Sequence, residues 1–529
     1  MTAVPDSFRS EHNAGGPTAP PGRSRVGHNA VLNFVGLAVP LALAFFVMPI
    51  AARYLGAARF GLLGLAWAIT EYLTLFDLGL GRALVKFVAE AMHRTDSDLE
   101  QIVSLSVAAQ FAAGLVGGVA FFLLAPTLVH NVFKVAPNLS GEALGVFRVV
   151  GISLPFVLLI SAQRAVLEGA QRFDLSAALK MLGSVASVLI PAIGAVAGAS
   201  LPSILIYVLF SRIVVSFLFA VAIRRAMPTI RWVTSPKWSV LRRVVSFGGW
   251  VFVSNTISPL LVYFDRFALG TVAGLAAVGF YTAPYEGLTR LLVLPASLFG
   301  SLLPVLTSVE AGGDSERFAR LSSSSQRLSL TLMSLPLSVA FIFAPELLRV
   351  WLGADYAAQS TTALRALTLG VMANALAMPM LVLLYAKHRP DLPAKFHLFE
   401  LAVHIPLTVL LIKAYGISGA AAAWTIRVTI DMCLLFWAGS RVSSISVGEL
   451  AGGDVLKSAV WVLLLVGSLA AAKALAVSSV MVAIAAATAT VVVFSAANWR
   501  WVLTQSDRSA LTGTLRSYAK LLPHTVFRG

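Results

Sequence analysis

Several charged side chains of this chain lie inside long apolar stretches, where they could bind a charged solute. Glu286 and Arg290 are four residues apart, and so are Arg427 and Asp431, so each pair would lie on one face of a helix. Arg212 has no acidic residue near it in its own stretch. A charge at the centre of a bilayer costs at least about 2.5–3.5 kcal/mol, so such residues usually face a cavity or a charged partner. Arginine suits phosphate groups because its planar guanidinium can bind two oxygens and remains ionised.

Each of these residues has a structural interpretation beside a functional one. Glu286 and Arg290 either neutralise each other, or Arg290 binds an anion that competes with Glu286. Glu71, at a similar depth in another stretch, is either an ion or proton site or a structural partner. Arg212 and Arg427 either line a polar cavity or bond to groups inside the bundle.

Further charges lie toward the ends of apolar stretches. Asp265, Arg266 and Arg53 lie at ends that we expect to be external, where snorkelling to the interface explains them. The alternative for these three is an outer gate or an outward-facing anion site. Arg164 and Lys180 lie near an inner end, where they either anchor the helices or form an inward mouth for the solute.

The sequence predicts neither a metal site nor catalysis. His397, Glu400 and His404 lie on about one face of a stretch and resemble metal ligands, but no fourth ligand is evident, and a titrating His404 is the better interpretation. Cys433 is the single cysteine, which excludes a disulfide framework and a cysteine metal site. There is no Gly-rich Walker loop for ATP hydrolysis, and the loops predicted to be external are short. We therefore expect no catalytic residues, no cofactor and no enzyme.

The stretches that must position these residues have the composition of membrane helices. Of the 529 residues, 58% are hydrophobic and only 12% are charged, with a mean hydropathy of +0.84. Soluble domains carry roughly 25% charged residues. Stretches of roughly 20 apolar residues cross about 30 Å of hydrocarbon as helices, so we predict an all-α integral membrane protein with about fourteen transmembrane helices. Their predicted ranges are 29–51, 60–79, 102–126, 144–167, 175–198, 202–223, 246–269, 276–298, 327–347, 363–386, 396–414, 417–439, 456–475 and 478–498.

Basic residues in the loops indicate the orientation. One alternate set of loops is rich in lysine and arginine, including Arg172, Arg389 and the region around Arg224. By the positive-inside rule, this side and both termini are cytoplasmic. The net charge of +16 does not indicate nucleic-acid binding, because the basic residues lie in short loops rather than in one patch. Residues 1–27 are polar and predict a disordered cytoplasmic tail.

An internal repeat relates the two halves of the chain. Residues 166–179 read VLEGAQRFDLSAAL, and residues 383–396 read LLYAKHRPDLPAKF. A glycine run at Gly56 and Gly61 meets a similar run at Gly274 and Gly279, and Arg212 also lies opposite Arg427. Since the shift corresponds to six predicted spans, an even number, the repeats are parallel. We predict an N-lobe over 28–224, a basic cytoplasmic linker over 225–245, a C-lobe over 246–440, two further helices over 441–499 and a basic cytoplasmic tail over 500–529.

Four segments carry a resemblance to a known family. They are ARYLGAARFGLLGLAWAITEYLTLFDLGLGRALVKFVAEA from Ala52, YFDRFALGTVAGLAAVGFYTAPYEGLTRLLVLPASL from Tyr263, PELLRVWLGADY from Pro345 and YGISGAAAAW from Tyr415. In their order across nearly the whole chain they resemble the Wzx-type lipid-linked oligosaccharide flippases, the polysaccharide-biosynthesis branch of the multidrug/oligosaccharidyl-lipid/polysaccharide (MOP) flippase superfamily.

The resemblance implies two six-helix lobes around a central cavity, open to one side at a time. The cargo it implies is a polyprenyl-diphosphate-linked oligosaccharide, moved from the cytoplasmic to the outer leaflet of a bacterial inner membrane for polysaccharide export. We expect a monomer in the lipid bilayer, with a polysaccharide polymerase and glycosyltransferases as partners. A lipid II flippase, a drug/cation antiporter and a non-transporting scaffold of an envelope-assembly complex remain as alternatives.

Overall fold

The computed structural model describes residues 23–74, 80–94, 99–228, 260–451, 455–475 and 480–502, together with residues 505 and 508. All regular secondary structure within these ranges is helical. A helix satisfies its backbone hydrogen bonds within one segment, which is what a chain needs when no water is present in the hydrocarbon. The predicted all-α membrane class is confirmed.

The first half of the chain forms a group of long helices. Helix α1 begins at Arg23, inside the range 1–27 that the sequence predicted as a tail, so residues 23–27 are helical. The helices of this half are α1 (Arg23–Leu73), α2 (Leu80–Arg94), α3 (Leu99–Thr127) with a π-helical end (Leu128–Val132), α4 (Pro137–Gly169), α5 (Phe173–Val196) and α6 (Leu201–Ala226). The predicted basic linker lies outside the described residues from residue 229 onward.

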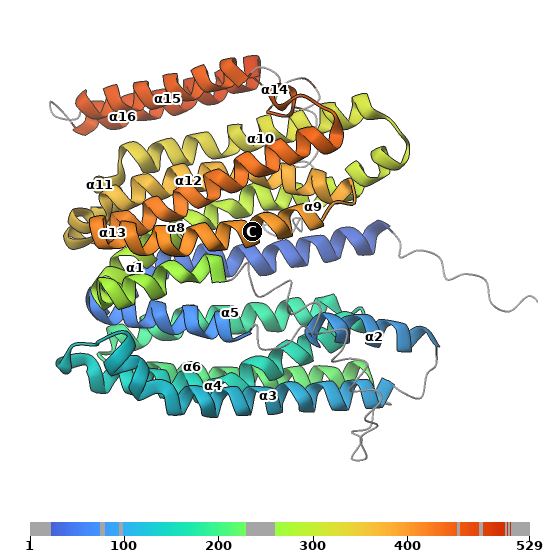
Figure 1. Ribbon diagram of the computed structural model, residues 1–529, viewed down its shortest axis with the longest axis vertical. Helices are drawn as coiled ribbons and strands as arrows, with labels where there is room; N and C mark the ends of the chain where they lie inside the picture. Colours follow the sequence, from blue (N-terminus) through green and yellow to red (C-terminus); the bar gives the residue numbers. More distant parts are fainter. Residues whose placement is uncertain are drawn as a thin grey trace, which may run out of the picture.

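The second half begins with a helix over the described residues 260–272, and residues 246–259 of its predicted span lie outside the description. The elements that follow are α8 (Leu275–Thr289), a 3-10 turn (Arg290–Leu292), α9 (Val293–Ala311), α10 (Ser315–Ile342), α11 (Ala344–Trp351), α12 (Ala354–Ala386), α13 (Asp391–Ser443), α14 (Val447–Leu450), α15 (Val455–Leu475), α16 (Val480–Ala497) and a π-helical end (Asn498–Val502). Figure 1 shows α2–α6 on one side of the molecule, α8–α16 on the other and α1 between them.

Seven of the described helices are long and apolar enough to cross a membrane, or eight if the bent pair α10 and α11 forms one span. Two of the long helices contain a kink at a glycine with positive φ, Gly56 in α1 and Gly416 in α13. Glycine adopts this backbone conformation without the steric cost of a Cβ. These kinks separate the predicted ranges 29–51 from 60–79 and 396–414 from 417–439, while the number of fourteen crossings stays a prediction.

The two halves repeat each other in detail. Arg172 Nε donates to Asp174 Oδ1 at 3.0 Å before α5, and Arg389 Nε donates to Asp391 Oδ1 at 2.9 Å at the start of α13. In both turns the residue before the arginine has a positive φ. The most buried spans, α4 and α12, also occupy corresponding places in the two predicted repeats. The lobe boundaries proposed above stay predictions.

The repeats meet at a reciprocal contact between α1 and α8. A Cβ on Gly61 would collide with the backbone carbonyl of Leu275, and a Cβ on Gly279 would collide with that of Ala57. A Cβ on Gly61 would also lie 2.8 Å from the amide nitrogen of Gly279. Small residues allow membrane helices to approach this closely. The glycines that the sequence aligned as repeat mates therefore pack directly against one another.

Candidate functional site

A cavity of about 1000 Å³ lies between the two groups of helices. Its walls come from α1, α4, α5 and α6 on one side, and from the helix over 260–272 and α8 with the following turn on the other. Among the described residues, seven charged ones line it: Glu71, Arg164, Lys180, Arg212, Arg266, Glu286 and Arg290. Five cations against two carboxylates give a formal excess of three positive charges. All seven were selected from the sequence, and the cavity brings them together.

On the α8 side, one carboxylate is shared by two arginines. Arg266 Nη2 donates to Glu286 Oε1 at 2.6 Å, and Arg290 Nη2 lies 3.4 Å from Glu286 Oε2. The Arg266 side chain is only 2% exposed, and its guanidinium lies over the Tyr285 ring at 4.6 Å. The predicted pairing of Glu286 with Arg290 is therefore present, and Arg266 is added to it. Arg290 Nε has no hydrogen-bond partner among the described residues.

On the opposite wall of the cavity, the cationic side chains have fewer carboxylate partners than Arg266 and Arg290 have. Arg212 Nη1 donates to Ser153 Oγ at 2.9 Å, and neither Arg212 nor Lys180 forms an ion pair within the described part of the chain. Arg164 Nε lies 3.5 Å from Glu168 Oε1 in the same helix. Glu71 of α1 lines the cavity with them. This wall therefore offers cationic groups that have few protein partners.

Asp265 and Arg266 are adjacent in sequence but lie in different surroundings. Asp265 Oδ1 lies 3.1 Å from His404 Nε2, and Tyr281 donates its hydroxyl to Asp265 Oδ2 at 2.9 Å. Asp265 and Arg266 are 0% and 2% exposed, so the expectation that they snorkel to the interface is wrong. Arg266 lies six residues before the end of its helix, about 9 Å along the axis, which keeps its charge inside the bundle.

Arg427 and Asp431 do not line the cavity, and the ion pair predicted between them is not the one observed. Arg427 Nη1 lies 3.3 Å from Glu400 Oε2, across the kink that separates the two halves of α13. Spacing along one helix indicated only a shared face, whereas the partner comes from the facing half. Sequence reasoning had considered Glu400 only as a metal ligand and so missed this pair.

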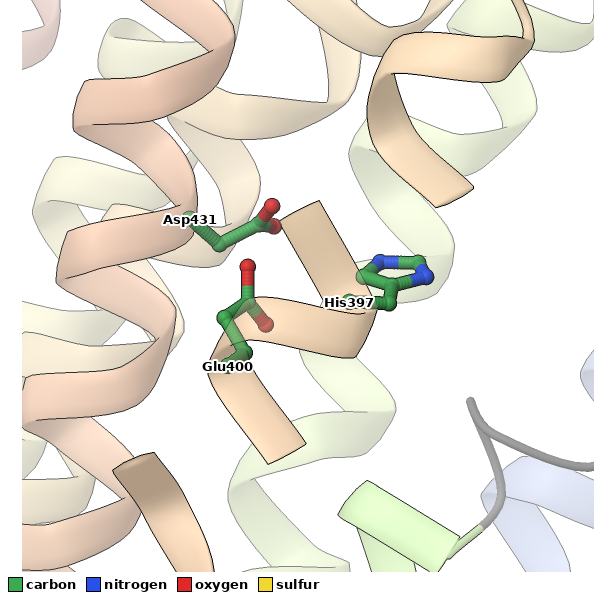
Figure 2. Close-up of side chains that lie close together, drawn as sticks. All are labelled: His397, Glu400 and Asp431. Atoms are coloured by element: carbon green, nitrogen blue, oxygen red, sulfur yellow. The ribbon is translucent and has the colours of Figure 1, made fainter. Parts of the chain in front are cut away.

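Figure 2 shows the side chains of His397, Glu400 and Asp431 close together, and Glu400 is also the partner of Arg427. One ligand atom from each lies within 4.8 Å of the others, so these side chains have the donor set of a metal site. The grouping predicted from the sequence differs, because His404 binds Asp265 instead. Arg427 contacts one Glu400 oxygen, so a divalent cation here would lie close to a guanidinium. We interpret the cluster as a buried ion-pair network.

Arg53 also lies outside the cavity. Its exposed guanidinium donates to the backbone carbonyl of Val350 in α11. This contact joins α1 to the second half of the chain. Arg53 therefore lies apart from Arg266, which lines the cavity.

Known proteins are similar to this chain in sequence and in fold. A curated relative from Shigella flexneri, named "Putative O-antigen transporter", is 29% identical over 418 residues, which cover 79% of this chain and 98% of the relative. The solved lipid II flippase MurJ in an inward closed conformation matches with a TM-score of 0.70 at 15% identity, covering 90% of this chain and all of that one.

An inward-facing multidrug resistance MATE family transporter of the MOP superfamily matches with a TM-score of 0.67 at 15% identity, over 78% of this chain and 98% of that one. At such low identity these two structures show the fold alone. The family described as polysaccharide biosynthesis protein matches residues 26–310, more than half of the chain. This chain therefore belongs to the polysaccharide biosynthesis protein family.

Proposed function

We propose that this protein is a flippase that moves a polyprenyl-diphosphate-linked oligosaccharide from the cytoplasmic to the outer leaflet by alternating access. It catalyses no covalent chemistry. The observation that carries the proposal is the carboxylate of Glu286, which lies between Arg266 and Arg290 inside a cavity with excess positive charge. The family membership and the O-antigen transporter among its relatives support the same cargo class.

Glu286 acts in this proposal as a placeholder for the diphosphate. Two arginines can each present a planar fork to phosphate oxygens, and such charge-assisted hydrogen bonds are about twice as strong as neutral ones. When the cargo leaves, the carboxylate again satisfies both guanidinium groups, so neither remains buried without a partner. Arg290 Nε, which has no hydrogen-bond partner in the described part of the chain, supplies a further donor for the anion. Binding is thus reversible, as transport requires.

The rest of the cavity suits a sugar chain. Its volume of about 1000 Å³ is at the upper end of ordinary ligand pockets, which hold about 300–1,000 Å³. Hydroxyl groups of Thr70, Ser161, Ser184 and Ser211 line it, and the buried Thr282 hydroxyl has no partner among the described residues. These groups offer hydrogen bonds to sugar hydroxyls, while the apolar tail of the cargo stays in the lipid.

The orientation follows from charge. We place both termini and the turns at Arg172 and Arg389 in the cytoplasm of a bacterium, with the protein in the inner membrane as a monomer. In α1 the lining residues nearest the kink at Gly56 are Ala51, about 7.5 Å before it along the axis, and Gly64, about 12 Å after it, and the lining extends to Ala44 and Thr74. From this level the cavity extends toward the end of the bundle that we place in the cytoplasm, as an inward-facing state needs. A polysaccharide polymerase and glycosyltransferases are the partners that would consume and supply the cargo.

Reconstituted vesicles provide the direct test. Purified protein should move a fluorescent polyprenyl-diphosphate oligosaccharide between leaflets, measured by the fraction that becomes accessible to an external quencher. Arg290→Ala and Arg266→Gln should slow this movement, because each removes a phosphate contact from the pair held by Glu286. Arg148→Ala is the matched control, since Arg148 is exposed and lies over the Phe122 ring outside the cavity.

The same vesicles separate the alternatives. Selective movement of lipid II with a peptide-bearing sugar would identify a peptidoglycan-precursor flippase. Export of a cationic dye down a sodium or proton gradient, without lipid movement, would identify an antiporter. Full polysaccharide export in cells carrying Arg290→Ala, with no lipid movement in vesicles, would indicate a scaffold. Any of these three results contradicts the proposal.

A further inference from the structure

The short helix α11 joins the two halves of the molecule beside the cavity. It follows α10 after a bend of 82°, so it does not continue along the direction of that helix. Its last residue, Trp351, contacts both α1 and α8. Three observations describe how α11 and its indole are held against α1 and α8.

The first observation is a hydrogen bond from the indole to a backbone carbonyl of α1 that has no N–H donor within its own helix. Trp351 Nε1 donates to the backbone carbonyl of Phe45 at 2.9 Å. The residue four positions after Phe45 is Pro49, which has no N–H to donate back to that carbonyl. The two rings are also stacked, with centroids 5.0 Å apart and planes inclined by 19°. Proline in α1 thus creates the acceptor that the indole occupies.

The second observation is that the indole packs directly against the backbone of Gly287, a contact that we call the seat of the indole. A Cβ on Gly287 of α8 would lie 2.5 Å from Cη2 and 3.0 Å from Cζ3 of Trp351. Any other residue at this position would displace the indole. Gly287 directly follows Glu286, the carboxylate that holds the two cavity arginines. The indole therefore fills a gap between α1 and α8 at the level of the proposed diphosphate site.

The third observation is a contact about two turns after Phe45 along α1. Phe45, Pro49 and Arg53 are spaced by four residues and lie on one face of the helix. Arg53 donates to the carbonyl of Val350, in the last turn of α11, where carbonyl groups have no partner within the helix. A cation at a helix C-terminus is also favoured by the helix dipole. The same face of α1 thus holds both final residues of α11.

We propose that Trp351 is a plug that closes a lateral opening between α1 and α8. This inference depends on the proposed function in one respect: a lipid-linked cargo keeps its tail in the bilayer, so its head group must pass sideways between helices. Phe45 is 44% exposed, which places this gap at the outside of the bundle rather than inside the cavity. The cargo leaves or enters the cavity when the indole withdraws and α11 separates from α1.

Spin-label distances test the plug without any cargo. In a Cys433→Ser background, labels at Phe46→Cys and Leu347→Cys report the separation of α1 and α11, since both side chains are exposed. Trp351→Phe keeps an aromatic ring, smaller than the indole, and removes the donor. Pro49→Ala gives Phe45 a donor from its own helix that competes with the indole. Each should raise the ratio of open to closed distances by about two- to twelve-fold, the factor for one net hydrogen bond.

Further variants make the result decisive. Gly287→Ala fills the seat and should raise the open fraction as well, while Trp437→Phe and Pro406→Ala, at exposed sites on α13, should leave it unchanged. If Trp351→Phe and Pro49→Ala act through one hydrogen bond, their combined effect should be smaller than the product of the two.

Unchanged distances in Trp351→Phe, Pro49→Ala and Gly287→Ala, in protein that elutes as wild type, would overturn the plug. These experiments test the plug separately from the proposed function. If the spin-label distances change as expected but the protein moves no polyprenyl-diphosphate lipid, the plug is supported and the proposed cargo is wrong. If the protein moves the lipid but the distances are the same in all variants, the proposed cargo is supported and the plug is wrong.

Discussion

Replacing Arg427 by methionine tests the buried ion-pair network most directly. Arg427 and Glu400 are 8% and 2% exposed, and their charged atoms lie 3.3 Å apart. With Asp431 nearby, the network has two carboxyl groups and one guanidinium, so Arg427→Met leaves the buried Glu400 and the half-buried Asp431 without a cation. Breaking a buried pair by removing one partner costs about 3–5 kcal/mol. Since 1.36 kcal/mol is a tenfold change, the unfolding equilibrium should shift by roughly a hundred- to several-thousand-fold.

Unfolding in mixed micelles of increasing SDS content, followed by far-UV circular dichroism, measures this shift. Glu400→Gln alone should cost less than about 1.5 kcal/mol, because its amide oxygen still accepts a hydrogen bond from Arg427. In the Arg427→Met background, Glu400→Gln should restore part of the lost stability, since one of the two unpaired charges is removed. Arg148→Met, at an exposed arginine, is the control and should have little effect.

Transport by the double variant decides between the two interpretations of Arg427. Because Arg427 lies outside the cavity, the protein carrying Arg427→Met and Glu400→Gln should still move its cargo in vesicles. A variant as stable as wild type after Arg427→Met alone would refute the buried-network reasoning. A well-folded double variant that no longer moves cargo would show instead that Arg427 contacts the cargo, as the sequence had suggested.

Three further predictions concern other parts of the molecule. Gly61→Ala should separate α1 from α8, because its Cβ meets backbone atoms that cannot rotate away; we expect a larger open fraction in spin-label distances across this contact. Hydrogen bonds from Arg389 and Lys395 lower the pKa of Asp391, so the turn should keep its stability above the ordinary value of 3.8 and lose it only as the pH falls toward the lowered pKa, measured by the mobility of a label at Ala394. Chelation with EDTA should leave lipid movement and stability unchanged, measured in the same vesicles, since we assign no metal to His397.

The sequence was sufficient for the elements and for the charges that line the cavity. Apolar stretches of membrane-spanning length have few alternatives to helices, and a charge inside such a stretch needs a polar environment. This reasoning selected Arg212, Glu286 and Arg290 without any knowledge of packing, and all three line one cavity. The repeat was also predictable, because the turns at Arg172 and Arg389 preserve both their residues and their geometry.

Partners across helices were not predictable in the same way. Spacing along one helix identifies a shared face, but it does not say which helix lies opposite, so Asp431 was chosen for Arg427 where Glu400 is the partner. Asp265 and Arg266 differ by about 100° around the helix axis, and the packing of the whole lobe decides that one meets His404 and the other the cavity. For the Trp351 plug, the local sequence indicates only that Pro49 leaves a backbone carbonyl of α1 without a donor. The donor that binds this carbonyl is more than 300 residues away in the chain.

The reciprocal contact of Gly61 with Leu275 and of Gly279 with Ala57 has the form of an interface between two identical subunits related by a twofold axis. A dimer of six-helix chains would make this contact twice with the same residues, and the present chain makes it with two copies of one segment. A duplicated and fused ancestor explains that pattern directly. It also leaves each copy free to diverge, so that one half kept a cationic wall at Arg212 while the other buried its counterpart Arg427 in an ion pair.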